Sequence, residues 1–209
     1  MADIRSAYYH DPARRPERDA LNDLVREVFG LDFGIWNGLG LDFEEYTPFT
    51  LFEGERAVAN VSASPLHLTL AGQERVGVQI GTVCTRPEAR RGGRIRRLMD
   101  AAHDHWQPRS DFQYLFANDS VLEFYQQFGY RPVPVYRFSC PVPAHETASR
   151  PARRLSLADP GDLAALRRRA DERSPVSLHC GLRRQAWLWL FHAAVAWPES
   201  LRLVEELDV

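Results

Sequence analysis

The sequence predicts an α+β fold with a mixed sheet, and three features lead to this prediction. Two long strand-like runs, 57–70 and 76–85, are joined by a short glycine turn, which is typical of an antiparallel hairpin. A helical pattern follows the hairpin, and strands and helices then alternate as far as residue 140. The chain is 44% hydrophobic over 209 residues, so it has enough apolar material to build a core.

The elements of the first 140 residues follow from hydrophobic periodicity and from turn residues. Leu21, Leu24 and Val25 recur at helical spacing within 16–29, and Gly30 marks the end of that helix. The glycine-rich and aromatic region 30–46 is expected to be a loop or a broken helix. The other expected elements are strands 47–53, 57–70, 76–85 and 112–117, a last strand or hairpin at 130–140, and helices 94–105 and 121–128, the last with an N-cap cluster at Asn118, Asp119 and Ser120.

A proline-rich segment divides the chain into two parts. Residues 141–152 contain three prolines and are expected to be a linker between a domain at 1–140 and a shorter part at 153–209. The shorter part is expected to hold a strand at 153–158, helices at 159–173 and 182–197, and a strand that begins at 201. This order of elements repeats the order at the front of the chain.

Composition excludes several classes of function. All 26 basic side chains are arginine, which excludes mechanisms that need a lysine, such as Schiff-base chemistry. Cys84, Cys140 and Cys180 are widely spaced, so we predict neither a metal site nor a disulfide framework, and a reducing cytoplasm is the expected location. The net charge of −2 predicts no nucleic-acid partner, and the arginine run 167–169 is typical of a solvated helix face. No signal peptide is recognised, and the apolar run 186–197 is too short to span a membrane.

The stretch 81–95 is the most informative about chemistry. A strand leads directly into a helix through a turn of arginines and glycines, from Arg90 to Arg94. The first turn of a helix presents unpaired backbone N–H groups, and Gly92 and Gly93 would let a ligand approach them closely. The arginines add charge-assisted hydrogen bonds, so the turn favours a phosphate or pyrophosphate cradle. Taken alone, the same turn is equally typical of a solvated helix start.

A second motif follows about one strand later, and together the two resemble the GCN5-related N-acetyltransferase (GNAT) superfamily. The superfamily's first motif, V-x-x-x-P-x-x-R/Q-x-x-G-x-G/A, is matched here by Val83, Pro87, Arg90 and Gly93. Its second motif, N-x-x-A-x-x-F/L-Y-x-x-x-G-F/Y, is matched by Asn118, Val121, Phe124, Tyr125, Gly129 and Tyr130. The resemblance covers roughly residues 15–140.

This resemblance implies a mostly antiparallel sheet with splayed central parallel strands, flanked by helices, and a partial second copy of the fold at 153–209. It also implies an N-acetyltransferase that moves an acetyl group from acetyl-coenzyme A directly to a primary amine of a small molecule or a peptide. The residues implied to bind the coenzyme are Val83, Thr85, Arg90, Arg91, Gly92, Gly93, Arg94, Ile95 and Asn118. Tyr125 is implied to protonate the leaving thiolate, whereas its position alone favours a packed helix aromatic.

Two residues depart from the superfamily's pattern. Ile95 stands where a glycine or alanine is usual, and Arg91 stands where glycine is frequent. The superfamily binds the coenzyme through backbone groups, so Ile95 is tolerated if it points into the core and weakens binding if it faces the pyrophosphate. The long hairpin and the linker also resemble the "enhanced intracellular survival" branch, in which a second acetyltransferase-like domain follows the first.

The acceptor side of the site is less defined by the sequence. Candidates for the general base, with none preferred, are Asp42, Glu44, Glu45, His67 and His103. In the superfamily the segment equivalent to 36–46 covers the cleft, and its aromatic and acidic residues would suit a cationic amine; packing into the core is the alternative. The apolar face of 182–197 needs a partner, either the first domain or another subunit of a homo-oligomer. The rival function is a coenzyme-binding module without catalysis.

Overall fold

The chain folds around one large mixed sheet, with a small two-stranded sheet near the C-terminus. The computed structural model describes residues 3–5, 12–38, 46–136, 139, 141, 151–183, 186–196 and 199–204. The strands are β1 (Asp3–Arg5), β2 (Thr47–Glu53), β3 (Arg56–Leu70), β4 (Gln73–Thr85), β5 (Phe112–Leu115), β6 (Arg153–Arg154), β7 (Cys180–Leu182) and β8 (Arg202–Leu203). The helices are α1 (Arg15–Phe29), α2 (Gly34–Gly38), α3 (Arg94–Trp106), α4 (Leu122–Gln126), α5 (Pro160–Glu172) and α6 (Ala186–Ala196).

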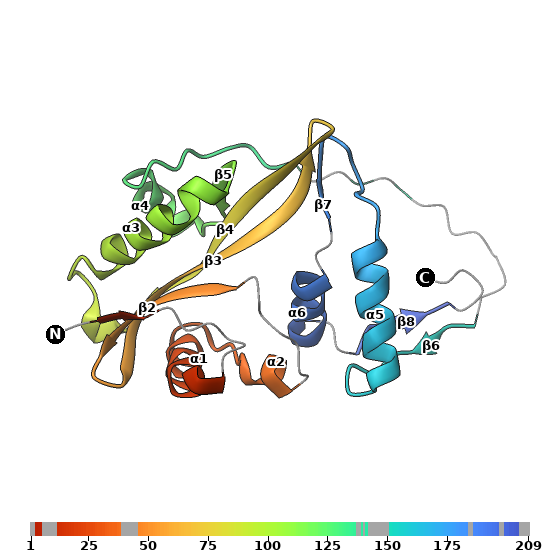
Figure 1. The fold of residues 1–209 in the computed structure, drawn as a ribbon, viewed down its shortest axis with the longest axis horizontal. Helices are drawn as coiled ribbons and strands as arrows, with labels where there is room; N and C mark the ends of the chain where they lie inside the picture. The colour runs from red at the N-terminus through yellow and green to blue at the C-terminus, as the bar shows by residue number, and fades with distance from the viewer. Residues whose placement is uncertain are drawn as a thin grey trace.

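The pairing of the large sheet confirms the predicted fold class. Its strands run in the order β1-β2-β3-β4-β5, and β7 pairs with β3 beside this path. These pairs are antiparallel, except that β4 and β5 run parallel. Helices α1 and α3 lie on opposite sides of the sheet in Figure 1, and each packs against β3 and β4. The sheet therefore has a buried layer on both faces.

The first helix forms for the reasons that the sequence suggests. Leu21, Leu24 and Val25 share one face of α1 and are fully buried. Gly30 ends the helix in the left-handed conformation, with a φ of 69°, and donates its N–H to the carbonyl of Arg26 at 2.9 Å. A glycine at this position adopts positive φ without the steric cost that a Cβ would bring.

The hairpin of β3 and β4 is the longest feature of the sheet. Its turn consists of Ala71 and Gly72, which both have positive φ, and Leu70 faces Gln73 across the turn. Strand β4 therefore begins at Gln73, three residues before the expected start at residue 76. The polar residues after the turn were interpreted as part of it, but their backbone already pairs with the end of β3.

The C-terminal segment packs against the first domain. Leu182 and Cys180 in β7 pair with the tip of β3. On α6, Phe191 contacts Phe33 and Trp36, with ring centroids 5.7 and 5.1 Å apart. Buried side chains of α1, α2, β2, β4, α5 and α6 belong to one continuous hydrophobic cluster. Elements of the N-terminal part thus supply a partner for the apolar surface of α6.

Several expected elements are shorter than the sequence suggests. No strand forms over residues 130–136, because Pro132 and Pro134 remove the amides that a strand would use for pairing; residues 137, 138 and 140 lie outside the described part. Strand β5 ends at Leu115, and β6 spans two residues. Helix α4 follows a short 3-10 turn, so it begins one residue later and ends two residues earlier than expected. Leu182 belongs to β7, although it was expected to begin the helix 182–197.

Replacing Leu190 by alanine tests whether the two parts share one core. Leu190 on α6 is 1% exposed within the cluster that includes α1 and α2. Leu190→Ala should lower the free energy of unfolding by about 2–5 kcal/mol, because it leaves a cavity in a packed core. We expect urea unfolding followed by tryptophan fluorescence to show a single transition at lower midpoint. The control is Leu178→Ala, whose side chain is 69% exposed; a transition of the first domain that ignores Leu190 would contradict a shared core.

Candidate functional site

The turn between β4 and α3 has the backbone shape of an anion-binding loop. Arg91 and Gly93 both have left-handed φ, at 66° and 65°. Helix α3 starts after Gly93, which has no side chain with which to cap the first amides. A Cβ built on Gly93 would meet nothing within 4 Å, so the space beside the helix start is open. Successive backbone N–H groups at an uncapped helix start attract an anion such as a diphosphate.

The side chains of this turn divide into two kinds. Arg90 and Arg91 are exposed beside the helix start. Arg94 is half-buried and donates to the carbonyl of Ala89 at 2.7 Å and to the Glu53 carboxylate at 2.8 Å. Its guanidinium lies over Gly92, so a larger side chain there would displace the end of the Arg94 side chain. The Arg94 side chain therefore braces the loop against β2, while the exposed arginines face solvent.

Ile95 packs against the buried cluster beneath α3. The apolar side chain thus fills space on the core side of the helix, where its size is tolerated. The sequence left open whether Ile95 points into the core or toward a bound phosphate. The core-facing orientation is the one compatible with a phosphate at the helix start.

The end of β4 is pinned to the rest of the protein by Arg86. Its side chain is 5% exposed, its Nε donates to the carbonyl of Ala57 at 2.8 Å, and its guanidinium pairs with Glu27 of α1. The backbone N–H of Arg86 also donates to the carbonyl of Val58 at 2.9 Å. These contacts fix the direction in which the chain leaves the sheet toward the loop. Sequence reasoning missed this residue, because an arginine among many carries no local signal of burial.

Strands β4 and β5 pair over four residues and then separate. Parallel pairing runs from Gly77 and Phe112 to Ile80 and Leu115. Beyond this point β4 continues to Thr85 with no β5 partner in the described part of the chain. Val83 and Thr85, two of the residues implied to bind the coenzyme, lie on this unpaired stretch. An extended ligand could pair there as an added strand.

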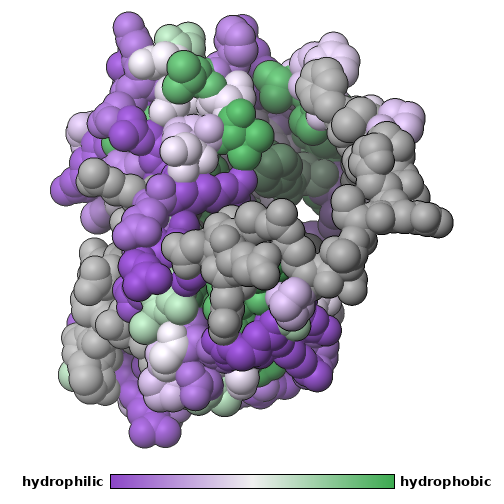
Figure 2. All heavy atoms as spheres, turned by 90° about the vertical axis from the view of Figure 1, so that its right-hand side faces the viewer, coloured by the Kyte–Doolittle hydropathy of each residue, from purple (hydrophilic) through white to green (hydrophobic). Residues whose placement is uncertain are grey.

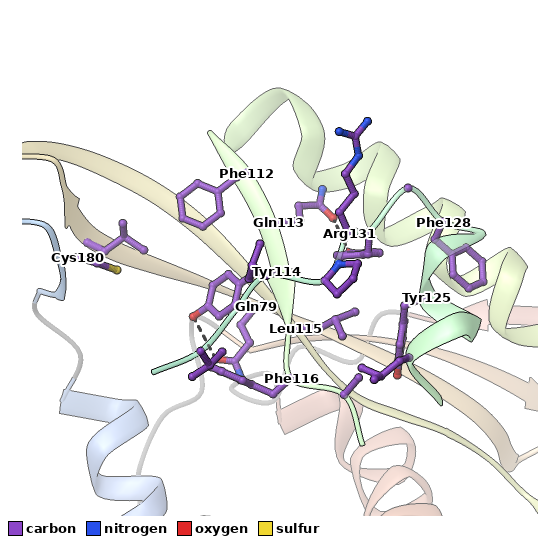
Figure 3. A pocket seen from close by; sticks show the side chains of 18 of the residues that line it. Gln79, Phe112, Gln113, Tyr114, Leu115, Phe116, Tyr125, Phe128, Arg131 and Cys180 are labelled. Atoms are coloured by element: carbon purple, nitrogen blue, oxygen red, sulfur yellow. Dashed lines mark hydrogen bonds between the residues drawn. The ribbon is translucent and has the colours of Figure 1, made fainter. Parts of the chain in front are cut away.

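Tyr125 opens into a large cavity beside β5. The cavity has a volume of about 1380 Å³, and side chains from β5, α3, α4, β7 and α6 line it. Figure 3 shows Tyr125 and Leu115 in this cavity together with Tyr114, whose hydroxyl donates to Gln79, and Cys180. Burial raises the pKa of Tyr125 above its ordinary value. Its phenol is therefore protonated at neutral pH and able to donate a proton.

A second hollow is lined by elements of the C-terminal segment. Figure 2 shows hydrophobic residues gathered around a depression on the face that carries this segment. A second cavity of about 790 Å³ lies between α5, α6, β7 and β8, and it shares Cys180, Leu188 and His192 with the cavity beside β5.

The implied site residues do not all meet at one cavity. Tyr125 lines the cavity beside β5. The other implied residues, which are those of the loop 90–95 together with Val83, Thr85 and Asn118, do not line it. Asn118 is exposed after β5, and its carbonyl accepts from Val121 at 3.0 Å. Asn118 is the N-cap residue of the short 3-10 turn 119–121, but its side chain makes no capping hydrogen bond there, and α4 itself begins only after Val121.

The structure separates the candidates for the acceptor side. Asp42, Glu44 and Glu45 lie outside the described residues. His67 is exposed on β3. His103 is half-buried, lies 3.1 Å from the Tyr130 hydroxyl and lines the cavity, and burial lowers the pKa of its imidazole.

Trp36 is fully buried against α6. It therefore belongs to the core, which is the alternative that the sequence analysis kept for the segment 36–46. Among the described residues, no group of three acidic, histidine or cysteine side chains could hold a metal ion. The same residues include no helix of the length and apolarity that crossing a membrane requires.

Solved structures with a similar fold include several acetyltransferases. A protein of unknown function from Enterococcus faecalis V583, described as a probable N-acyltransferase, has a TM-score of 0.60 at 19% identity; the match covers 94% of this chain and 49% of that one. This chain thus spans about half the length of that protein. An aminoglycoside acetyltransferase from an uncultured soil metagenomic sample has a TM-score of 0.53 at 17% identity, over 68% of this chain and 97% of that one.

A third solved structure has a similar fold, and a family model matches the sequence. Glucosamine-6-phosphate N-acetyltransferase from Arabidopsis thaliana has a TM-score of 0.52 at 13% identity, over 67% of this chain and 98% of that one. No curated protein matches the sequence significantly. The model of the acetyltransferase (GNAT) domain matches residues 11–133, which is more than half of the chain. Together with the mixed sheet and the arginine-glycine loop, this match means that the chain belongs to the GNAT acetyltransferase family.

Proposed function

We propose that this protein transfers an acetyl group from acetyl-coenzyme A to the primary amine of a small molecule. The observation that carries the proposal is the start of α3 behind Gly93, which a 3-10 turn at Pro87–Ala89 and the loop 90–93 connect to the stretch of β4 that has left β5. A diphosphate at the helix start and an extended chain along β4 are the two parts that the coenzyme would offer to such a surface.

The loop would hold the diphosphate mainly through its backbone. The amides of Gly93, Arg94 and Ile95 lie at the positive end of the α3 dipole, and the left-handed Arg91 turns the chain toward them. Arg90 and Arg91 are exposed and would add charge-assisted hydrogen bonds. The Arg94 side chain would act by bracing Gly92 and the rest of the loop, since it is already bound to Glu53.

The remaining coenzyme contacts would lie along the opening between the strands. Backbone groups of Val83 and Thr85 would pair with the pantetheine arm, and Asn118, exposed just after β5, would contact it from the other side. Burial raises the pKa of the Cys84 thiol between them to about 12. That thiol is therefore protonated at neutral pH and is a poor nucleophile, which supports direct transfer over an acyl-cysteine intermediate.

The chemistry would be a direct attack by a neutral amine. The amine nitrogen forms a bond to the thioester carbonyl carbon, the carbon–sulfur bond breaks, and the sulfur takes a proton from the Tyr125 hydroxyl. The nitrogen loses its extra proton to solvent or to a nearby base. The raised pKa of Tyr125 supports this role, because it keeps the phenol protonated until the thiolate forms.

The acceptor is proposed from the structural neighbours. One structure of similar fold is an aminoglycoside acetyltransferase in complex with sisomicin, and another is glucosamine-6-phosphate N-acetyltransferase. Both names describe amino sugars as acceptors, so amines of this kind should be tested first, followed by polyamines and peptides. Release of free thiol from acetyl-coenzyme A is the appropriate assay for such a panel.

Replacing Tyr125 by phenylalanine separates catalysis from binding. Tyr125→Phe should lower kcat about 100-fold, because the leaving thiolate loses its proton donor, while the Kd for coenzyme A stays within about twofold. Thiol release gives kcat, and calorimetry gives the Kd. A wild-type protein that binds coenzyme A but releases no thiol with any amine would instead indicate a coenzyme-binding module without catalysis.

Replacing Gly93 by alanine tests the loop. Left-handed φ costs an alanine about 1–2 kcal/mol, so Gly93→Ala should shift the loop and weaken coenzyme A binding about tenfold by calorimetry. The matched control is Gly72→Ala at the tip of the hairpin, where φ is 76° and a Cβ also meets nothing within 4 Å. Both variants should lose similar stability, and equal loss of coenzyme binding in both would argue against a role of the loop.

The pH dependence of kcat follows from the direction of the Tyr125 shift. Burial disfavours the phenolate and raises the pKa, so the protonated form that donates the proton persists to higher pH than a free tyrosine allows. We expect kcat to rise from acidic to neutral pH as the amine loses its proton, and then to stay flat to about pH 10. A fall in kcat centred below pH 9 in the wild type, absent in Tyr125→Phe, would contradict this assignment.

A further inference from the structure

We propose that four buried polar residues, Tyr46, Thr50, Asn60 and Ser62, are positioning residues that hold Thr82 in its left-handed conformation. By doing so they would set the point at which β4 leaves β5 and the aim of the backbone at Val83. These four residues are called the Thr82 support below. The inference rests on the proposed function and adds a device for keeping the coenzyme-binding edge of β4 open.

Thr82 has an unusual backbone conformation for its residue type. Its φ is 48°, a region that β-branched residues rarely adopt because of steric crowding around Cβ. Among the described residues, the two other non-glycine positions with positive φ, Ala71 and Arg91, lie in turns, whereas Thr82 lies inside a strand. A residue in such a conformation persists when surrounding contacts hold it there.

Thr82 is held at both its side chain and its carbonyl. Asn60 Nδ2 donates to the Thr82 carbonyl at 2.9 Å. The Tyr46 hydroxyl donates to Thr82 Oγ1 at 3.1 Å. These two contacts come from β3 and from the residue that precedes β2, so they connect the irregular point of β4 to the neighbouring strands.

The support is itself a closed set of hydrogen bonds. Ser62 Oγ donates to the Tyr46 hydroxyl at 2.6 Å, and Asn60 Nδ2 donates to Ser62 Oγ at 2.8 Å. Thr50 Oγ1 donates to Asn60 Oδ1 at 2.7 Å, which defines the orientation of the amide. The exposed fractions are 0% for Thr50 and Asn60, 1% for Ser62 and 7% for Tyr46. Buried polar groups that satisfy one another in this way restrict the backbone more than apolar packing does.

Thr82 lies where the register of the sheet changes. Ser62 faces Gly81 and Asn60 faces Cys84, so two residues of β4, Thr82 and Val83, lie opposite Val61 alone. This is a β-bulge, which bends a strand and redirects the residues beside it. The parallel pairing with β5 ends at Ile80, two residues before Thr82. The Thr82 support therefore acts at the point that opens the edge of β4 carrying Val83 and Thr85.

The test combines a variant that removes a contact of the Thr82 support with a variant that no longer requires the support. Asn60→Ala deletes the contact to the Thr82 carbonyl and should lower kcat/KM for acetyl-coenzyme A at least tenfold in the full chain. Thr82→Gly needs no support, because glycine adopts positive φ freely. In the double variant Asn60→Ala with Thr82→Gly, we expect kcat/KM to return to within threefold of Thr82→Gly alone. If Asn60→Ala lowered kcat/KM only by destabilising the fold, without an effect on the bulge, adding Thr82→Gly would not restore kcat/KM.

Hydrogen exchange of residues 81–85 gives a readout that does not depend on turnover. Exchange there should accelerate at least tenfold in Asn60→Ala and return toward the wild-type rate in the double variant. Ser62→Ala is the milder variant if Asn60→Ala fails to fold, with the same directions expected. The control is Thr69→Val, a buried polar residue of β3 beyond the bulge that is 3% exposed.

The outcomes separate this inference from the proposed function. Unchanged exchange and unchanged kcat/KM in Asn60→Ala, or a double variant no better than Asn60→Ala, would overturn the inference. A wild-type protein that neither binds coenzyme A nor releases thiol would overturn the proposed function, while the exchange measurement would still decide whether the support holds the bulge.

Discussion

One extra residue in β4, opposite Val61 of β3, is the constraint on which the candidate site depends. From Gly77 to Ile80 the strand pairs on both sides, and after the bulge at Thr82 only the pairing with β3 continues in the described part of the chain. The unpaired edge leads to Arg86, which ties the strand to α1, and then to the loop before α3. Strand edge, loop and helix start thus form one continuous backbone surface, and a long ligand with an anionic end suits its shape.

The two faces of the sheet have different tasks around this surface. On one face, α3 packs through Leu98 and Met99 and carries the loop at its start. On the other face, α1 and α2 join the C-terminal segment in one cluster around Trp36. The sheet that leads into the loop is therefore packed on both faces. Rigid support of this kind lets irregular backbone present its amides without collapsing onto them.

Much of the fold and part of the site were predictable from local patterns. Hydrophobic spacing predicted α1 and α3, and the arginines and glycines from Arg90 to Gly93 marked the loop. The strand expected at 130–140 was wrong over its described residues, because alternating Val133 and Val135 outweighed two prolines in the prediction. The Thr82 support was not predictable, since its members are spread over 46–62, act on a residue at 82, and look like ordinary polar residues of strands. Only the register of the sheet brings them together.

The pairing of β7 with the tip of β3 has a consequence for how the chain can be divided. Without β7, the distal part of β3 would present unpaired amides and carbonyls along an edge that also carries Leu68 and Leu70. Such edges recruit strands from other molecules and promote aggregation. The C-terminal segment thus covers this edge of the sheet, and a chain shortened ahead of β7 would expose it.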